Sequence, residues 1–79
     1  MERTLALSQL RSLWSQALAV AEYEITEQSI FFNLGGDSFL LLRLAFAIED
    51  SFGASLTPEE MIENCSLESM ADLLCAKTR

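Results

Sequence analysis

The five residues Leu34-Gly35-Gly36-Asp37-Ser38 mark the point at which a polar connecting segment gives way to an apolar helix. The two glycines allow a sharp turn because they lack a Cβ atom. Asp37 is a favourable helix N-cap, and Ser38 follows in the first turn, near the positive end of the helix dipole. A phosphate ester on the Ser38 hydroxyl would lie beside unpaired backbone N–H groups, which form a natural anion site. The pattern predicts a serine that is presented for modification.

The residues after this turn recur with helical spacing, which predicts a helix over residues 38 to about 52. At 100° per residue, its expected core face consists of Leu41, Leu44, Ala45, Ile48 and Phe52. The opposite face carries Phe39, Arg43, Phe46 and Asp50. Two phenylalanines on the side away from the core are unusual, and Gly53 is expected to end the helix.

A first helix is predicted upstream, from Leu5 to about Val20, because apolar side chains recur there at steps of three and four residues. Thr4 is its expected N-cap, and Trp14 is expected to anchor the core, with a partner surface as the alternative. The connection over residues 21–37 is unusually long, and such loops are often functional.

Five apolar residues in this connection should hold it against the helices: Ile25, Ile30, Phe31, Phe32 and Leu34. The adjacent pair Phe31-Phe32 is expected to fix the position of Ser38, because it lies just before the glycines.

Two further helices are predicted downstream. Thr57-Pro58-Glu59-Glu60 combines an N-cap threonine, a proline at the first helical position and a capping-box glutamate, so a short helix should run from Pro58 to about Asn64. Ser66 should cap the last helix, whose apolar stripe is Leu67, Met70, Ala71, Leu73 and Leu74. Lys77 and Arg79 lie at its C-terminal end, as the helix dipole favours.

No segment alternates with the period of a strand, so the expected fold is all-α. We expect a four-helix bundle of three main helices and one short helix, with a long loop between the first and second helices. Residues 1–79 should form a single domain whose core spans about residues 5–76.

Composition limits the classes of function. The 79 residues carry a net charge of −7, from 12 acidic and 5 basic residues, which argues against nucleic acid and anionic membranes as partners. The charge favours partners with basic docking faces, or it simply keeps a small domain soluble.

Cys65 and Cys75 are expected to be reduced thiols. Without a signal peptide or a transmembrane run, the sequence predicts a cytoplasmic location.

Catalysis by the chain itself is not expected. The sequence contains no histidine, so Ser38 cannot belong to a Ser-His-Asp triad, and neither a phosphate-binding loop, a zinc pattern nor an EF-hand is present. The sequence therefore predicts no catalytic residue and no metal site. Ser38 is better interpreted as a hydroxyl that another enzyme modifies.

Carrier domains have an attachment signature that resembles the run Phe31-Phe32-Asn33-Leu34-Gly35-Gly36-Asp37-Ser38-Phe39-Leu40-Leu41-Leu42-Arg43-Leu44. These are the peptidyl and acyl carrier (thiolation) domains of nonribosomal peptide and polyketide synthases. The family's first-helix pattern is similar to Leu13-Trp14-Ser15-Gln16-Ala17-Leu18, and its final helix to Ser66-Leu67-Glu68-Ser69-Met70-Ala71-Asp72-Leu73-Leu74. The resemblance covers about residues 5–76.

This resemblance implies a phosphopantetheinyl transferase that moves 4′-phosphopantetheine from coenzyme A onto Ser38, with Gly35, Gly36 and Asp37 supporting the motif. The thiol of the arm would hold acyl, aminoacyl or peptidyl groups as thioesters. The carrier would deliver them to condensation, adenylation, ketosynthase or other synthase domains, and it would be monomeric in isolation.

Exposed apolar residues beside Ser38 suggest docking to those partners through Phe39, Leu40, Leu42, Arg43 and Phe46. The alternative is that Phe39 and Phe46 pack under the long loop as core.

The Gly-Gly-Asp-Ser form and the scarcity of acidic residues on the second helix favour a peptidyl carrier. Ser29-Ile30 departs from the peptidyl-carrier pattern, and polyketide or hybrid carriers stay open.

Two other classes of function compete with a carrier. The first is a helical interaction module that has the carrier fold but no prosthetic group. The second is a small hydrolase that uses Ser38, which would lack a base.

Overall fold

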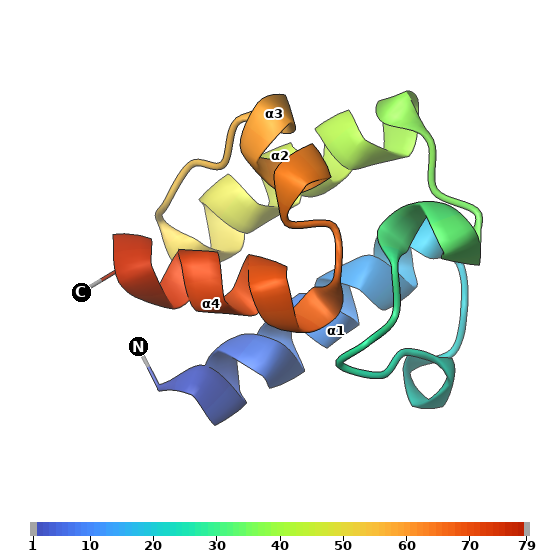
Figure 1. Ribbon diagram of the computed structural model, residues 1–79, viewed down its shortest axis with the longest axis horizontal. Helices are drawn as coiled ribbons and strands as arrows, with labels where there is room; N and C mark the ends of the chain where they lie inside the picture. Colours follow the sequence, from blue (N-terminus) through green and yellow to red (C-terminus); the bar gives the residue numbers. More distant parts are fainter. Residues whose placement is uncertain (1, 79) are drawn as a thin grey trace.

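A computed structural model describes residues 2–78 and contains four α-helices and two short 3₁₀ turns in this range. In chain order these are α1 (Arg3–Leu18), η1 (Glu22–Glu24), η2 (Phe31–Leu34), α2 (Ser38–Phe52), α3 (Pro58–Glu63) and α4 (Leu67–Lys77). Helices α1 and α4 lie side by side, and α2 runs antiparallel to α1 on the other side of the core (Figure 1). The described residues form no strand, only an isolated bridge between Ile30 and Ser66. The predicted all-α architecture is confirmed.

Helix α2 has the bounds that its sequence signals predict. The side chain of Asp37 caps it by accepting a hydrogen bond from the N–H of Leu40 at 2.8 Å. Gly53 ends it in the left-handed conformation, with φ of 69°. Its buried residues are Leu41, Leu44, Ile48 and Phe52, while Ala45 is half-buried.

Helix α1 begins earlier than its apolar spacing predicts. Glu2, not Thr4, occupies the N-cap position, and it makes no side-chain cap bond. The guanidinium of Arg3, the first residue of the helix, binds Asp72 of α4 at 2.8 Å. The helix ends at Leu18 rather than near Val20, because Ala19 adopts the left-handed conformation with φ of 57°. Both corrections arise from contacts or backbone geometry that apolar periodicity does not encode.

The two C-terminal helices have the predicted caps. Thr57 and Glu60 form the expected reciprocal capping box at the start of α3, which ends at Glu63. The Ser66 hydroxyl accepts from the N–H of Ser69 at 3.1 Å at the start of α4. Four members of the predicted apolar stripe of α4 are buried, and Leu73 is half-buried. Arg79, expected near this end, lies outside the described residues.

The core is a single cluster of buried side chains drawn from all four helices and the long loop. Trp14 is fully buried within it, as predicted for a core anchor. The loop contributes Ile25 and Phe31, which are buried, and Ile30 and Leu34, which are half-buried. The long connection is therefore part of the packed structure.

Backbone hydrogen bonds also join this loop to the start of α4. The N–H of Leu67 donates to the carbonyl of Ser29 at 3.1 Å, and the N–H of Glu68 donates to that of Glu27 at 3.0 Å. In return, the N–H of Phe31 donates to the carbonyl of Cys65 at 3.0 Å. The loop thus satisfies two N-terminal donors of α4 that have no partner inside the helix.

Candidate functional site

Ser38 is the first residue of α2 and is exposed. Within residues 2–78 the hydroxyl of Ser38 makes no hydrogen bond, and the backbone N–H groups of Ser38 and Phe39 have no partner in this range either. The neighbouring carboxylate of Asp37 accepts from the N–H of Leu40 through Oδ1, and within residues 2–78 it makes no hydrogen bond with the Ser38 hydroxyl. The site therefore presents an accessible, unactivated alcohol beside free backbone donors at a helix N-terminus.

The turn before Ser38 is positioned by Phe31. Its ring is fully buried and packs edge-to-face on Trp14, with the ring centroids 5.3 Å apart and an interplanar angle of 79°. Its carbonyl accepts from the N–H of Gly36 at 3.1 Å. Gly35, between them, has φ of 98°, a conformation that favours glycine. The core thereby fixes the backbone immediately ahead of α2.

The two residues of the Phe31-Phe32 pair have different environments. The ring of Phe32 packs edge-to-face on that of Phe31, with the ring centroids 5.9 Å apart, yet Phe32 is 38% exposed. The expectation that both phenylalanines hold the loop against the helices is therefore wrong for Phe32. The pair lies in the 3₁₀ turn η2, where adjacent side chains point in different directions, and only Phe31 points at Trp14.

Three of the five predicted docking residues form one exposed apolar stripe on α2. Phe39 is 67% exposed, Leu42 47% and Phe46 65%, so neither phenylalanine packs under the loop. Leu40 is half-buried against the core cluster. Arg43 is exposed and lines a groove on the flank of α2 that faces α1. The apolar stripe is therefore Phe39, Leu42 and Phe46.

One exposed apolar residue that the sequence did not single out lies on α3, outside the apolar stripe. Ile62 on α3 is 55% exposed, and α3 packs against α2. A signal was present, because Met61 is the buried residue of this short helix and its neighbour Ile62 lies about 100° further around the axis. Exposed apolar side chains are thus not confined to α2.

The ion pairs found within residues 2–78 lie away from Ser38 and join α1 to the long loop and to α4, and α3 to α4. Arg3 contacts Asp72 and, at 3.5 Å, Glu27, while Lys77 contacts Glu60 at 2.9 Å. The hydrogen bond and charge of Asp72 raise the pKa of Arg3.

Among the described residues, no group of three or more His, Cys, Asp or Glu side chains is placed to hold a metal ion. No helix in this range is both long and apolar enough to cross a membrane.

A four-helix bundle that presents a free serine at the start of its second helix, after a Gly-Gly-Asp turn, has the architecture of a carrier domain. Residues 8–74 match the protein family described as "Phosphopantetheine attachment site". The chain belongs to this family, whose members carry 4′-phosphopantetheine covalently on a serine and are not themselves catalytic. The exposed Ser38 hydroxyl and the free N–H groups beside it fit such a phosphate ester.

The chain is similar to short stretches of large fungal synthetases. It is 38% identical over 71 residues to the hybrid PKS-NRPS synthetase opdA of Penicillium oxalicum, covering 90% of this chain and 2% of that protein. It is 46% identical over 68 residues to cyclo-acetoacetyl-L-tryptophan synthase of Aspergillus oryzae, covering 86% of this chain and 2% of that protein. The chain therefore spans about 2% of the length of these relatives.

Solved structures of carrier proteins share its fold. A free-standing peptidyl carrier protein from Acinetobacter baumannii has a TM-score of 0.90 at 19% identity, covering 99% of this chain and 98% of that one. The HMG-ACPI domain of the CurA module from Lyngbya majuscula has a TM-score of 0.87 at 19% identity, covering 98% of this chain and 79% of that one. The predicted carrier-protein bundle is confirmed, and the chain is a carrier domain.

Proposed function

We propose that Ser38 is the serine that bears the 4′-phosphopantetheine arm in this chain. The observation that carries the proposal is the exposed Ser38 hydroxyl at the N-terminus of α2, which has no hydrogen bond within the described residues. Gly35 and Gly36 form the turn, and Asp37 caps the helix, so the alcohol projects from the first turn of α2. Within the described residues no side chain accepts a hydrogen bond from the Ser38 hydroxyl, so the transferase would remove its proton.

The chain would provide the attachment point of the arm and the backbone groups that contact its phosphate. The Oγ–P bond would form at Ser38 as the bond from phosphorus to the 3′,5′-ADP part of coenzyme A breaks. When attached, the group supplies a thiol that holds acyl, aminoacyl or peptidyl intermediates as thioesters. The free N–H groups of Ser38 and Phe39 lie where they can bind the phosphate oxygens. A tether of this kind raises the local concentration of the intermediate at each partner active site.

Carrier domains interact with the other domains of their synthases. For this chain we propose a phosphopantetheinyl transferase and condensation, adenylation or ketosynthase domains as partners. They would dock on the apolar stripe, with Leu40 and Arg43 at its margin. Support comes from the exposure of the stripe next to Ser38, since large exposed apolar residues mark interaction sites. The fungal hybrid synthetases that resemble the chain favour an assembly line that joins polyketide and amino-acid units.

Intact-protein mass spectrometry after incubation with coenzyme A and a broad-specificity transferase tests the attachment. We expect the chain to gain one phosphopantetheine group, and we expect Ser38→Ala to abolish the gain. Ser51→Ala is the matched control, because Ser51 is an exposed serine at the other end of the same helix and should not affect loading. An unmodified wild-type chain would favour the interaction module without a prosthetic group instead.

A further inference from the structure

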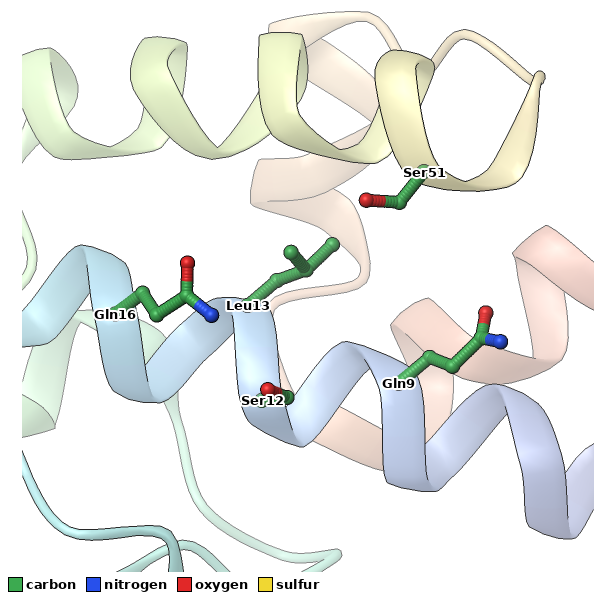
Figure 2. Close-up of a pocket in the computed structure, with 5 residues that line it drawn as sticks. All are labelled: Gln9, Ser12, Leu13, Gln16 and Ser51. Carbon is green, nitrogen blue, oxygen red and sulfur yellow. The ribbon is translucent and has the colours of Figure 1, made fainter.

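A groove runs along the contact between α1 and α2. One part of it is lined by Gln9, Ser12, Leu13, Gln16 and Ser51, and the adjoining part by Leu13, Gln16, Ala17, Arg43 and Ala47. Both parts share Leu13 and Gln16, so they adjoin at these two side chains. In Figure 2, Leu13 rises from α1 between the two helices, with Gln9 and Gln16 on either side and Ser51 opposite on α2.

This groove lies on the flank of α2 away from Ser38. Ser38 and Ala47 are nine positions apart, which at 100° per residue places them about 180° apart around the helix axis. The arm would leave Ser38 on one side of α2, and the groove opens on the other side.

The polar side chains of the groove have no hydrogen-bond partners among the described residues. Among residues 2–78, the side chains of Gln9, Ser12, Gln16, Arg43 and Ser51 make no hydrogen bond or ion pair, and Gln9 Oε1 is a buried acceptor without a donor. Their apolar neighbours Leu13, Ala17 and Ala47 complete the lining. Amides and hydroxyls that alternate with apolar surface are suited to the N–H and C=O groups of an extended peptide.

Charge indicates which peptide fits. No acidic residue lines the groove, although the chain has 12 acidic and 5 basic residues. Arg43 offers a free guanidinium at the end nearer the start of α2 and can bind a carboxylate through two parallel hydrogen bonds. The other end, at Ser51, follows Glu49 and Asp50, which disfavour a second carboxylate there.

We propose that the groove between α1 and α2 binds a short, extended acidic segment of another polypeptide domain, with the acidic side chain at Arg43. Arg43 and Ser51 are separated by about 12 Å along α2, which matches about four extended residues. The proposal adds a second docking surface to the apolar stripe. It does not require the modification of Ser38.

Titration of the isotope-labelled chain, without its arm, followed by NMR tests the proposal. The probe is the peptide acetyl-Asp-Leu-Ser-Ala-amide, and its twin with Asn in place of Asp is the matched control. We expect millimolar binding of the acidic peptide, with shift changes centred on Gln16, Arg43 and Ala47. The Asn twin and Arg43→Gln should each weaken binding by about fivefold, as expected for a lost ion pair. Lys77→Gln removes the same charge on α4 and should leave binding unchanged.

Three outcomes would overturn the proposal. The first is the absence of shifts in the groove at millimolar peptide, and the second is equal binding of the Asn twin. The third is a set of shifts in the groove that appears without peptide when the arm is installed, because the arm itself would then be the occupant. A failure of arm loading at Ser38 would leave the peptide titration unaffected, so the two proposals are tested separately.

Discussion

Gly36 lies against Phe31 so closely that no Cβ atom fits between them. A Cβ built on Gly36 would lie 2.7 Å from the carbonyl oxygen of Phe31 and would overlap the edge of its ring. The backbone of Gly36 has an ordinary negative φ, so the requirement for glycine is one of space rather than of conformation. Because the Phe31 ring is held by Trp14, the attachment turn is in effect packed onto the core.

Gly36→Ala should therefore disturb both the turn and the aromatic core. We expect the free energy of unfolding to fall by about 1–3 kcal/mol, the usual cost of overpacking. We also expect the near-ultraviolet circular dichroism of Trp14 to change, because Phe31 must move. Gly53→Ala is the control, because its added Cβ meets open space. This variant should lose only about 1 kcal/mol, because alanine is disfavoured at the positive φ of 69°. Its aromatic signal should be unchanged. An unchanged Trp14 signal in Gly36→Ala would contradict the packing relationship.

The adjacent phenylalanines should respond differently to the same substitution. Phe31→Leu removes a buried ring that contacts Trp14, and we expect it to lower the free energy of unfolding by about 1–2 kcal/mol. Phe32→Leu changes a ring that is 38% exposed and should cost no more than about 0.5 kcal/mol. Urea denaturation of both variants measures the difference, and equal losses would argue against the observed burial.

Changes in the apolar stripe should affect partners rather than folding. Phe39→Ala and Phe46→Asp should leave the far-ultraviolet circular dichroism intact and alter the free energy of unfolding by no more than about 0.5 kcal/mol. Turnover with a partner domain should nevertheless fall, because the variants lose exposed apolar contact area beside Ser38. Leu41→Ala is the matched core control on the same helix and should cost about 2–5 kcal/mol. Unfolding of Phe39→Ala would show that it belongs to the core.

The free energy of unfolding should depend on pH in the acid range because of the carboxyl group of Glu60. The backbone N–H of Thr57, which donates to the carboxylate at 2.9 Å, and then the ammonium of Lys77 hold the pKa of Glu60 below its usual value of 4.5. Because the pKa of Glu60 is lower in the folded state than in the unfolded state, its ionised carboxylate stabilises the fold above about pH 4.5. This stabilisation is lost as the pH falls through the folded-state pKa.

Urea midpoints measured from neutral pH down to about pH 3 test this assignment with the variant Glu60→Gln. Gln keeps an oxygen that can accept from the N–H of Thr57 but does not titrate. The variant should therefore lose less stability than the wild type over the acid range. Parallel curves for the two proteins would show that Glu60 does not contribute to the acid dependence.

Local chemistry made several elements of this protein predictable. The bounds of α2 follow from Asp37, which caps its start, and Gly53, which tolerates a positive φ at its end. The starts of α3 and α4 follow in the same way from the capping box at Thr57 and from Ser66. Ser38 could be singled out as an exposed helix-start hydroxyl for the same reason. Each of these signals acts over a few neighbouring residues, so the amino-acid sequence by itself determined them.

Other features depend on partners that are distant in the chain. Arg3, the first residue of α1, pairs with Asp72 on α4, 69 positions away. Phe31 is buried and Phe32 exposed because only one of two adjacent rings can face Trp14. Arg43 lies in a groove because α1 packs beside α2 on that flank. Only the tertiary structure decided these points, because burial and pairing are set by which elements pack together, and apolar periodicity along one segment does not specify its neighbours.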